Sequence, residues 1–279
     1  MKRTIALYLL ICLTQTGMSQ TIDVLTYNIK YDNPKDSLNS WENRKDFLIS
    51  QLNFYTPDVF GTQEGLRHQL RDIENGLEDY AFFGVGRDNG NEEGEFTAIF
   101  YNTEKFILLS ESTFWLSKTP EKPSKGWDAA LPRICTYGLF KIKKNNRQFY
   151  VFNTHFDHVG ENAREESAKL ILNKIEALNN NDLPVILMGD FNLEENASGI
   201  KFILKELADT HALAGKNSHG PIGTFNGFHF AKPVTRRIDY IFVDKAKLKV
   251  LKNGILSDSK DCSYPSDHLP VYTELKFEN

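Results

Sequence analysis

The sequence predicts an α+β fold in which helices pack around an extensive system of mixed β-sheet. Short apolar runs typical of strands alternate along the chain with segments whose apolar residues recur at helical spacing. The 279 residues are 41% hydrophobic, which is enough to bury a core, and they contain no internal repeat, low-complexity tract or linker. We therefore expect a single domain, residues 20–279, preceded by a leader.

The leader is predicted over residues 1–19. A basic start at 1–3 precedes an apolar run at 5–13 and small residues up to Ser19, which is the pattern of a secretory signal peptide. The apolar run is shorter than the ~20 residues that a membrane helix needs. Cys12 follows a large residue, whereas lipidation signals prefer a small one there, so we expect no lipid anchor. These features predict an exported protein, periplasmic or extracellular, without a transmembrane segment.

The elements are predicted from their periods. Strands are expected where apolar and β-branched residues follow one another, and helices where apolar residues fall three or four positions apart. In chain order, the predicted strands are residues 22–29, 59–63, 97–101, 106–116, 134–142, 149–154, 185–188, 237–243, 248–256 and 271–277. The predicted helices are residues 41–55, 66–77, 168–178 and 199–207.

Cap and turn residues separate these elements. Ser40 is of the N-cap type and stands at the start of the first helix, and Pro57 follows the end of that helix. Segment 84–94 has four glycines and several charges, so we predict a surface loop there. Segment 143–147 separates two strands at a distance that predicts a hairpin.

The charge and the cysteines limit the function classes. The net charge is −4, and it becomes −6 once Lys2 and Arg3 are removed with the leader. Tight, nonspecific binding to nucleic acid depends on Lys and Arg that neutralise phosphates, so this acidic balance disfavours it. Two cysteines remain, Cys135 and Cys262. An oxidising compartment permits a disulfide between them, but we expect two buried, unpaired thiols.

Polar side chains stand at strand ends in six places. They are Asn28, Glu64, His155, the pair Asp190 and Asn192, Asp239, and the pair Asp267 and His268. A buried carboxylate is costly unless it is paired or binds a cation. Strand ends are also where sites assemble in α/β folds. We therefore expect these side chains to meet in one site.

The residue types at the strand ends indicate a magnesium centre. Carboxylate and amide oxygens are the hard ligands that Mg²⁺ prefers, and Mn²⁺ is an expected substitute. The sequence has no cysteine cluster and no HExxH motif of the kind that binds zinc. Segment 153–158 partly matches the HxHxDH zinc motif of metallo-β-lactamase-fold hydrolases, but Asn153 replaces its first histidine. With His155 and His268 available for proton transfer, the set predicts metal-assisted phosphoester hydrolysis.

Taken in order, six short motifs resemble those of the endonuclease/exonuclease/phosphatase superfamily, which has the fold of DNase I and exonuclease III. The motifs are TYNI, QE, NTH, GDFN, RIDYIF and SDHLPV, and they cover nearly all of the chain after the leader. The resemblance implies a four-layer sandwich of two mixed β-sheets flanked by helices. It also implies that the site lies at one edge of this sandwich.

The resemblance implies a role for each matching residue around the metal. Glu64 would bind Mg²⁺, with help from Asn28 and Asp267. Asp190 would orient or deprotonate the attacking water, and Asn192 would hold the same part of the site.

The resemblance also implies which residues act on the phosphate. His268 would contact the scissile phosphate, Asp239 would fix the tautomer of His268, and His155 would stabilise the pentacoordinate phosphate. Two positions depart from the abasic-site endonucleases of this superfamily: Lys30 replaces an acid, and His155 replaces a tyrosine. Both departures favour the DNase I, sphingomyelinase, deadenylase and phosphatase branches over DNA repair.

Arg133 and Arg164 are predicted substrate contacts, because a guanidinium binds phosphate in a bidentate manner. The leading hypothesis is an exported, Mg²⁺-dependent phosphoesterase that hydrolyses a phosphomonoester or a phosphodiester, either a small molecule or a nucleic acid. We expect it to be a monomer. One alternative is an extracellular nuclease of the DNase I type. An alternative of another class is a catalytically silent module that binds a phosphate ligand.

Overall fold

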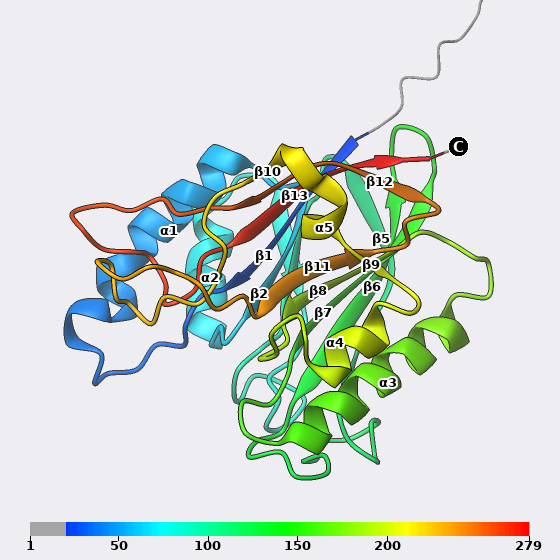
Figure 1. Cartoon of the computed structure of the whole chain (residues 1–279), viewed down its shortest axis with the longest axis horizontal. Coiled ribbons are helices and arrows are strands. Elements are labelled where there is room, and N and C mark those ends of the chain that lie inside the picture. The colour runs from blue at the N-terminus through cyan, green and yellow to red at the C-terminus, as the bar shows by residue number, and fades with distance from the viewer. Residues whose placement is uncertain (1–20, 279) are drawn as a thin grey trace, which may run out of the picture.

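Two β-sheets are stacked between two layers of helices in the computed structural model, which describes residues 21–278 (Figure 1). This is the fold class that the sequence predicts. The predicted signal peptide lies outside the described residues and stays a prediction. Within residues 21–278, we find no helix with the length and apolar character needed to cross a membrane.

The first sheet has seven strands and is mixed. In order across the sheet, the strands are β10 (Ser218–His219), β12 (Leu248–Ile255), β13 (Val271–Phe277), β1 (Thr21–Asn28), β2 (Val59–Gln63), β4 (Ile99–Asn102) and β3 (Tyr80–Phe83). β1 pairs in parallel with β2 and antiparallel with β13. The carboxyl ends of β1 and β2 therefore lie beside the amino end of β13.

The second sheet has six strands and is also mixed. Across the sheet they are β5 (Phe106–Trp115), β6 (Ile134–Ile142), β7 (Gln148–His155), β8 (Val185–Asp190), β11 (Asp239–Val243) and β9 (Ala208–Asp209). β6 and β7 form the predicted hairpin. β7 is parallel to β8, and β11 is antiparallel to β8 with Asp239 opposite Asp190. This register brings two of the predicted site residues onto neighbouring strands.

Helices cover the outer face of each sheet. α1 (Trp41–Tyr55) and α2 (Arg67–Gly76) pack on the first sheet, and α3 (Glu161–Leu178) and α4 (Ser198–Ile203) pack on the second. The short helices are η1 (Ser37–Asn39), α5 (Thr210–Ala214) and η2 (Gly215–Asn217).

The central strands are buried on both faces, which is why they read as nearly continuous apolar runs. In β7, Phe149 and Val151 belong to the core between the two sheets. Tyr150 and Phe152, which alternate with them, pack on the other face with Ile171 of α3. The two-residue period of the strand thus supplies two separate cores.

A buried amide joins the two sheets next to the strand ends. Asn153 Nδ2 donates to the carbonyl oxygens of Thr62 and Ala98 at 2.9 Å each, and Asn153 Oδ1 accepts from Gln63 Nε2 at 2.7 Å. A Cβ at Gly61 would lie 2.6 Å from Asn153 Cγ, so only glycine leaves room for this amide. Because Asn153 bonds within the sandwich, it cannot take the first place in the zinc motif considered above.

The structure differs from the prediction mainly at short elements. β3, β9, β10 and α5 were not predicted, because segments of two to five residues are too short to show a period. The helix predicted over 199–207 ends at Ile203, after which the Lys205 and Glu206 N–H groups donate to carbonyl oxygens three residues earlier and interrupt the α-helical pattern. Cys135 and Cys262 are both unpaired, as expected, but the prediction that both are buried is wrong for Cys262, which is exposed.

Candidate active site

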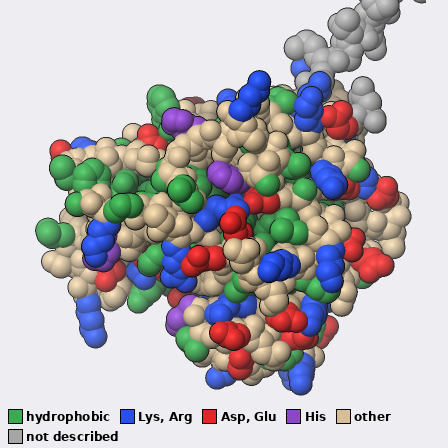
Figure 2. Space-filling view, in the orientation of Figure 1, with side chains coloured by type: hydrophobic (Ala, Val, Ile, Leu, Met, Phe, Trp, Pro, Cys, Tyr) green, Lys and Arg blue, Asp and Glu red, His purple; other side chains and the backbone are tan. Residues whose placement is uncertain are grey.

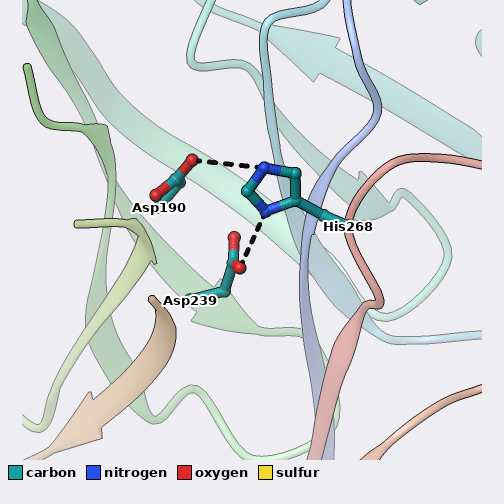
Figure 3. Close-up of side chains that lie close together, drawn as sticks. All are labelled: Asp190, Asp239 and His268. Atoms are coloured by element: carbon teal, nitrogen blue, oxygen red, sulfur yellow. Dashed lines mark hydrogen bonds and ion pairs between the residues drawn. The ribbon is translucent and has the colours of Figure 1, made fainter. Parts of the chain in front are cut away.

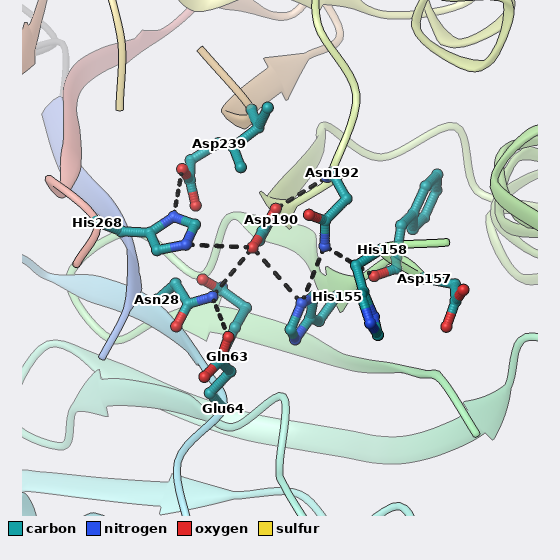
Figure 4. A network of polar contacts seen from close by, with 12 residues as sticks. Asn28, Gln63, Glu64, His155, Asp157, His158, Asp190, Asn192, Asp239 and His268 are labelled. Atoms are coloured by element: carbon teal, nitrogen blue, oxygen red, sulfur yellow. Dashed lines mark hydrogen bonds and ion pairs between the residues drawn. The ribbon is translucent and has the colours of Figure 1, made fainter. Parts of the chain in front are cut away.

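The predicted strand-end residues lie together at one edge of the sandwich; Figure 4 shows all of them except Asp267, which lines the same cavity. β1, β2, β7 and β8 end at this edge, and β11 begins there, so residues far apart in the sequence become neighbours. The edge contains a cavity of about 560 Å³. Six of these strand-end residues line it: Glu64, His155, Asp190, Asn192, Asp267 and His268.

Three of the residues that line the cavity have left-handed backbone conformations that non-glycine residues rarely adopt. Their φ angles are 56° at Lys30, 63° at Glu64 and 48° at Asn192. Such a conformation costs on the order of 1–3 kcal/mol and tends to occur at functional sites. Each of these residues lies one or two positions after the end of a strand, and its side chain lines the cavity.

Asn28 connects the two carboxylates nearest to it. Its Nδ2 donates to Glu64 Oε1 at 3.1 Å and to Asp190 Oδ2 at 3.0 Å. Its Oδ1 accepts from the Lys30 backbone N–H at 3.0 Å, which fixes the orientation of the amide. An amide oxygen has two lone pairs, so this bond leaves one of them for a metal ion, and the metal role of Asn28 stays a prediction. The structure places Asn28 as a residue that positions both carboxylates.

Asp190 lies at the centre of the polar network. Its Oδ1 accepts from the Asn192 N–H at 2.9 Å. Its Oδ2 lies 3.5 Å from His155 Nε2 and 3.8 Å from His268 Nε2. Burial, together with the charge of Asp239, raises the pKa of Asp190 to about 7. This carboxyl group can therefore exchange a proton near neutral pH.

His268 lies between two carboxylates (Figure 3). Its Nδ1 is 2.9 Å from Asp239 Oδ2, which makes Nδ1 the donor when the carboxylate is ionised. Burial opposes the charged form of His268, but Asp239 and Asp190 outweigh it and raise the pKa of His268 to about 10. At neutral pH this imidazole is a cation.

His155 is neutral, and its tautomer follows from its neighbours. Asn192 Nδ2 donates to the carbonyl oxygen of Phe156 at 3.1 Å, which fixes that amide, and it lies 3.2 Å from His155 Nε2. His155 Nε2 is therefore the acceptor, and Nδ1 carries the proton. Burial and the charge of Arg133 hold the pKa of His155 well below its usual value. The two histidines that flank Asp190 thus differ in charge.

Glu64 and Asp267 could hold a divalent cation. Burial alone would raise the pKa of Glu64, but Lys30 and His268 outweigh it, so this carboxyl group is ionised. Lys30 Nζ lies 3.5 Å from Glu64 Oε2 and 4.0 Å from Asp267 Oδ2, so both carboxylates already attract a positive charge. Oxygen donors of this kind suit Mg²⁺.

A second acidic cluster also deserves consideration as a metal site. Ligand atoms of Asp190, Asp239 and His268 lie within 4.8 Å of one another. However, His268 Nδ1 and Asp239 Oδ2 are used in their mutual hydrogen bond. Because His268 is a cation at neutral pH, Glu64 and Asp267 are the better candidates to hold a metal ion, and Asp239–His268 forms an acid–histidine pair.

Sequence reasoning missed Glu95 and Arg87. Glu95 lines the cavity and accepts two hydrogen bonds from the buried Arg87 guanidinium, at 2.6 and 2.7 Å. Burial raises the pKa of Glu95 to about 7, although Arg87 opposes this rise. The glycines of segment 84–94 predicted a surface loop, so the burial of Arg87 within this segment was not expected. The available signal was an acid directly before the apolar run that enters β4.

The two predicted substrate contacts have different positions. Arg133 lines the cavity, as does His158 beside it. Arg164 is not among the residues that line the cavity, and its Nη1 donates to the Asp157 carbonyl oxygen at 3.1 Å. The structure therefore does not bring Arg164 into the cavity, and its guanidinium bonds the Asp157 backbone instead.

Solved structures resemble the chain over most of its length. An endonuclease/exonuclease/phosphatase family protein from Bacteroides thetaiotaomicron is 39% identical with a TM-score of 0.89, and the match covers 94% of this chain and 99% of that one. A mannosyl-6-phosphatase from Bacteroides thetaiotaomicron VPI-5482 is 39% identical with a TM-score of 0.86, and the match covers 91% and 99% of the two chains.

Sequence comparisons agree with the structural ones. An uncharacterized protein of Acanthamoeba polyphaga mimivirus is 34% identical over 57% of this chain, which spans 62% of the length of that relative. The model of the endonuclease/exonuclease/phosphatase family matches residues 25–268. That match includes every strand-end residue described above, from Asn28 to His268. The chain therefore belongs to the endonuclease/exonuclease/phosphatase family.

Proposed function

We propose that the chain is a Mg²⁺-dependent phosphoesterase in which water attacks the phosphorus of a small phosphate ester. The observation that carries the proposal is the arrangement around Asp190. This carboxyl group lies between a neutral histidine, His155, and a cationic one, His268. A base, a fixed cation and a neutral donor are the groups that hydrolysis of a phosphate ester requires.

Glu64 and Asp267 would hold the ion, and Mn²⁺ would serve as a substitute. When bound, Mg²⁺ supplies Lewis-acid polarisation of a phosphoryl oxygen. The Lys30 ammonium lies beside both carboxylates and adds a positive charge to this part of the site. We expect Asn28 to keep the Glu64 carboxylate oriented through the hydrogen bond from its amide.

The chain's own residues manage the protons. Asp190 is placed to take a proton from the attacking water, and the Asn192 N–H and the Asn28 amide hold its two oxygens. His268 is placed to donate a hydrogen bond from Nε2 to the phosphoryl group as negative charge builds on it. His155 presents Nδ1–H as a second donor. Fixed donors of this kind stabilise the transition state without reorganisation.

The size and charge of the site favour a small substrate. The cavity measures about 560 Å³, which suits a molecule of small-metabolite size. On the face shown in Figure 2, basic and acidic side chains are interspersed, which does not favour a long polyanion. A neighbour that is 39% identical is a mannosyl-6-phosphatase, which supports a phosphorylated sugar as the substrate.

We expect EDTA to abolish hydrolysis of small phosphate esters and Mg²⁺ or Mn²⁺ to restore it. The measurement is a panel of sugar phosphates, nucleotides, lipid head groups and polynucleotides, assayed for alcohol and phosphate release. Salt-sensitive cleavage of polynucleotides alone would favour the nuclease alternative. A chain that binds Mg²⁺ but turns over nothing on the panel would be the silent binding module.

Metal binding should strengthen as the pH rises. Without metal, the pKa values of Asp190 and Glu95 are about 7, so both carboxyls hold protons below that pH and disfavour a cation. These raised pKa values also mean that the metal-free fold loses stability as the pH rises toward 7. We expect Mg²⁺ to raise the Tm much more at about pH 8 than at about pH 5.

The control for this pH effect is Glu64→Gln, which removes a predicted ligand. Thermal unfolding of this variant should show little Mg²⁺-induced rise in Tm at either pH. If Mg²⁺ raised the wild-type Tm equally at both pH values, the proposal that Glu64 and Asp267 hold the cation next to Asp190 and Glu95 would be contradicted.

A further inference from the structure

Arg133 has a hydrogen-bonding group that the chain itself does not use. The residue is 4% exposed and lines the cavity just before β6. Its Nε donates to Asp157 Oδ2 at 3.3 Å, and its Nη2 lies 2.9 Å from His158 Nδ1. Its Nη1 is buried and has no partner among residues 21–278. A buried charged donor without a partner is costly, and because Arg133 also lines the cavity, an anion bound there can become that partner.

The Arg133 guanidinium is held in place before any ligand arrives. Asp157, which accepts from Nε, also accepts from the backbone N–H groups of Ala130, Val159 and Gly160 at 3.1, 3.0 and 2.8 Å. These bonds fix the carboxylate and hence the arginine beside it. A donor that is positioned in advance binds an anion without the cost of ordering a free side chain.

His158 adds a second donor to the same wall. Arginine can only donate, so His158 Nδ1 accepts from it and the neutral ring carries its proton on Nε2. His158 is exposed and lines the cavity. The cavity lining therefore includes the carboxylates of Glu64 and Asp267 as well as the donors Arg133 and His158.

We propose that Arg133 and His158 bind the terminal non-bridging oxygens of a phosphomonoester and make the enzyme prefer monoesters to diesters. A terminal phosphoryl group has one more negative oxygen than a diester, and this oxygen can accept from Arg133 Nη1. In a diester, an uncharged ester oxygen and its substituent take that place, which leaves Arg133 Nη1 without a charged partner. This inference rests on the proposed hydrolysis and narrows its substrate class.

The kinetic test compares p-nitrophenyl phosphate with bis-p-nitrophenyl phosphate. In Arg133→Gln, we expect kcat/KM to fall about 30-fold for the monoester and by less than about threefold for the diester. His158→Gln changes an exposed side chain, and we expect a fall of about fivefold for the monoester.

Arg164→Gln is the matched control for this comparison. Arg164 bonds the backbone of the same Asp157 but is not among the residues that line the cavity. Its replacement therefore tests whether disturbing the segment around Asp157 changes the kinetics when no charge is removed from the cavity. We expect this variant to keep the wild-type ratio of monoester to diester kcat/KM. Equal falls for both esters in Arg133→Gln, or the same change of ratio in Arg164→Gln, would overturn the proposal.

Binding of inorganic phosphate tests Arg133 without turnover. Calorimetric titration of the Mg²⁺-loaded protein should show at least about tenfold weaker binding in Arg133→Gln than in wild type and Arg164→Gln. Unchanged affinity in Arg133→Gln would overturn the assignment. If wild type hydrolyses neither ester, the proposed hydrolysis fails, but this titration still decides whether Arg133 binds a phosphate group.

Discussion

Asp190→Asn is expected to lower kcat by about 10³-fold, within the range that a general base contributes. The substitution keeps the size of the side chain but removes the group that can take a proton from water. Asp190 is 1% exposed and lies 3.5 Å from His155 Nε2. Bulk water therefore has little access to this position and cannot readily replace the carboxylate as the base. Steady-state kinetics at saturating Mg²⁺ is the measurement. Activity within about tenfold of wild type would contradict the role of Asp190 as base.

Asp209→Asn is the control for this experiment. Asp209 is also a buried carboxylate in the second sheet, but it pairs with Arg237 at 2.7 Å and caps α5 outside the cavity. Its replacement should lower the Tm and leave kcat close to wild type. Asp190→Asn should instead lower kcat and leave the Tm unchanged or higher. The pKa of Asp190 is raised to about 7, so its ionised form destabilises the folded state near neutral pH, and the substitution removes that charge.

Much of the site could be predicted from the sequence because its polar residues stand at the ends of apolar strands. Each predicted residue follows or precedes an apolar run, and the two-sided burial of those runs leaves only their ends for polar groups. The parallel pairs β1–β2 and β7–β8 then bring four such ends to one edge of the sandwich. Asp190 and Asp239 meet because antiparallel pairing puts one at the end of its strand and the other at the start.

What the sequence could not predict depends on tertiary contacts. Arg133 and Arg164 are equally good phosphate ligands by residue type, but only Arg133 lines the cavity. Arg87 lies in a segment whose glycines and charges are typical of a surface loop, and burial follows only from its pairing with Glu95. The orientation of the Asn28 amide depends on a backbone N–H two residues later, which local patterns do not reveal.

His268→Gln is expected to lower kcat by about 10³-fold, because it removes the cationic donor from the phosphoryl group. Asp239→Asn should lower kcat by about 10²-fold, since it leaves the His268 imidazole in place but removes the carboxylate that fixes its tautomer and favours its charge. If Asp239 acts through His268, the double variant should be no slower than His268→Gln alone. Costs that multiply would mean that the two residues act independently.

The pH profile separates this positioning role from a purely structural one. The pKa of His268 is raised to about 10, so the wild-type cation should persist and activity should decline only as the pH rises toward that value. In Asp239→Asn, the largest favourable charge beside the ring is gone, while burial still disfavours the cation. The alkaline decline of kcat should then begin near neutral pH. A structural defect alone would lower kcat at every pH and leave the position of this decline unchanged.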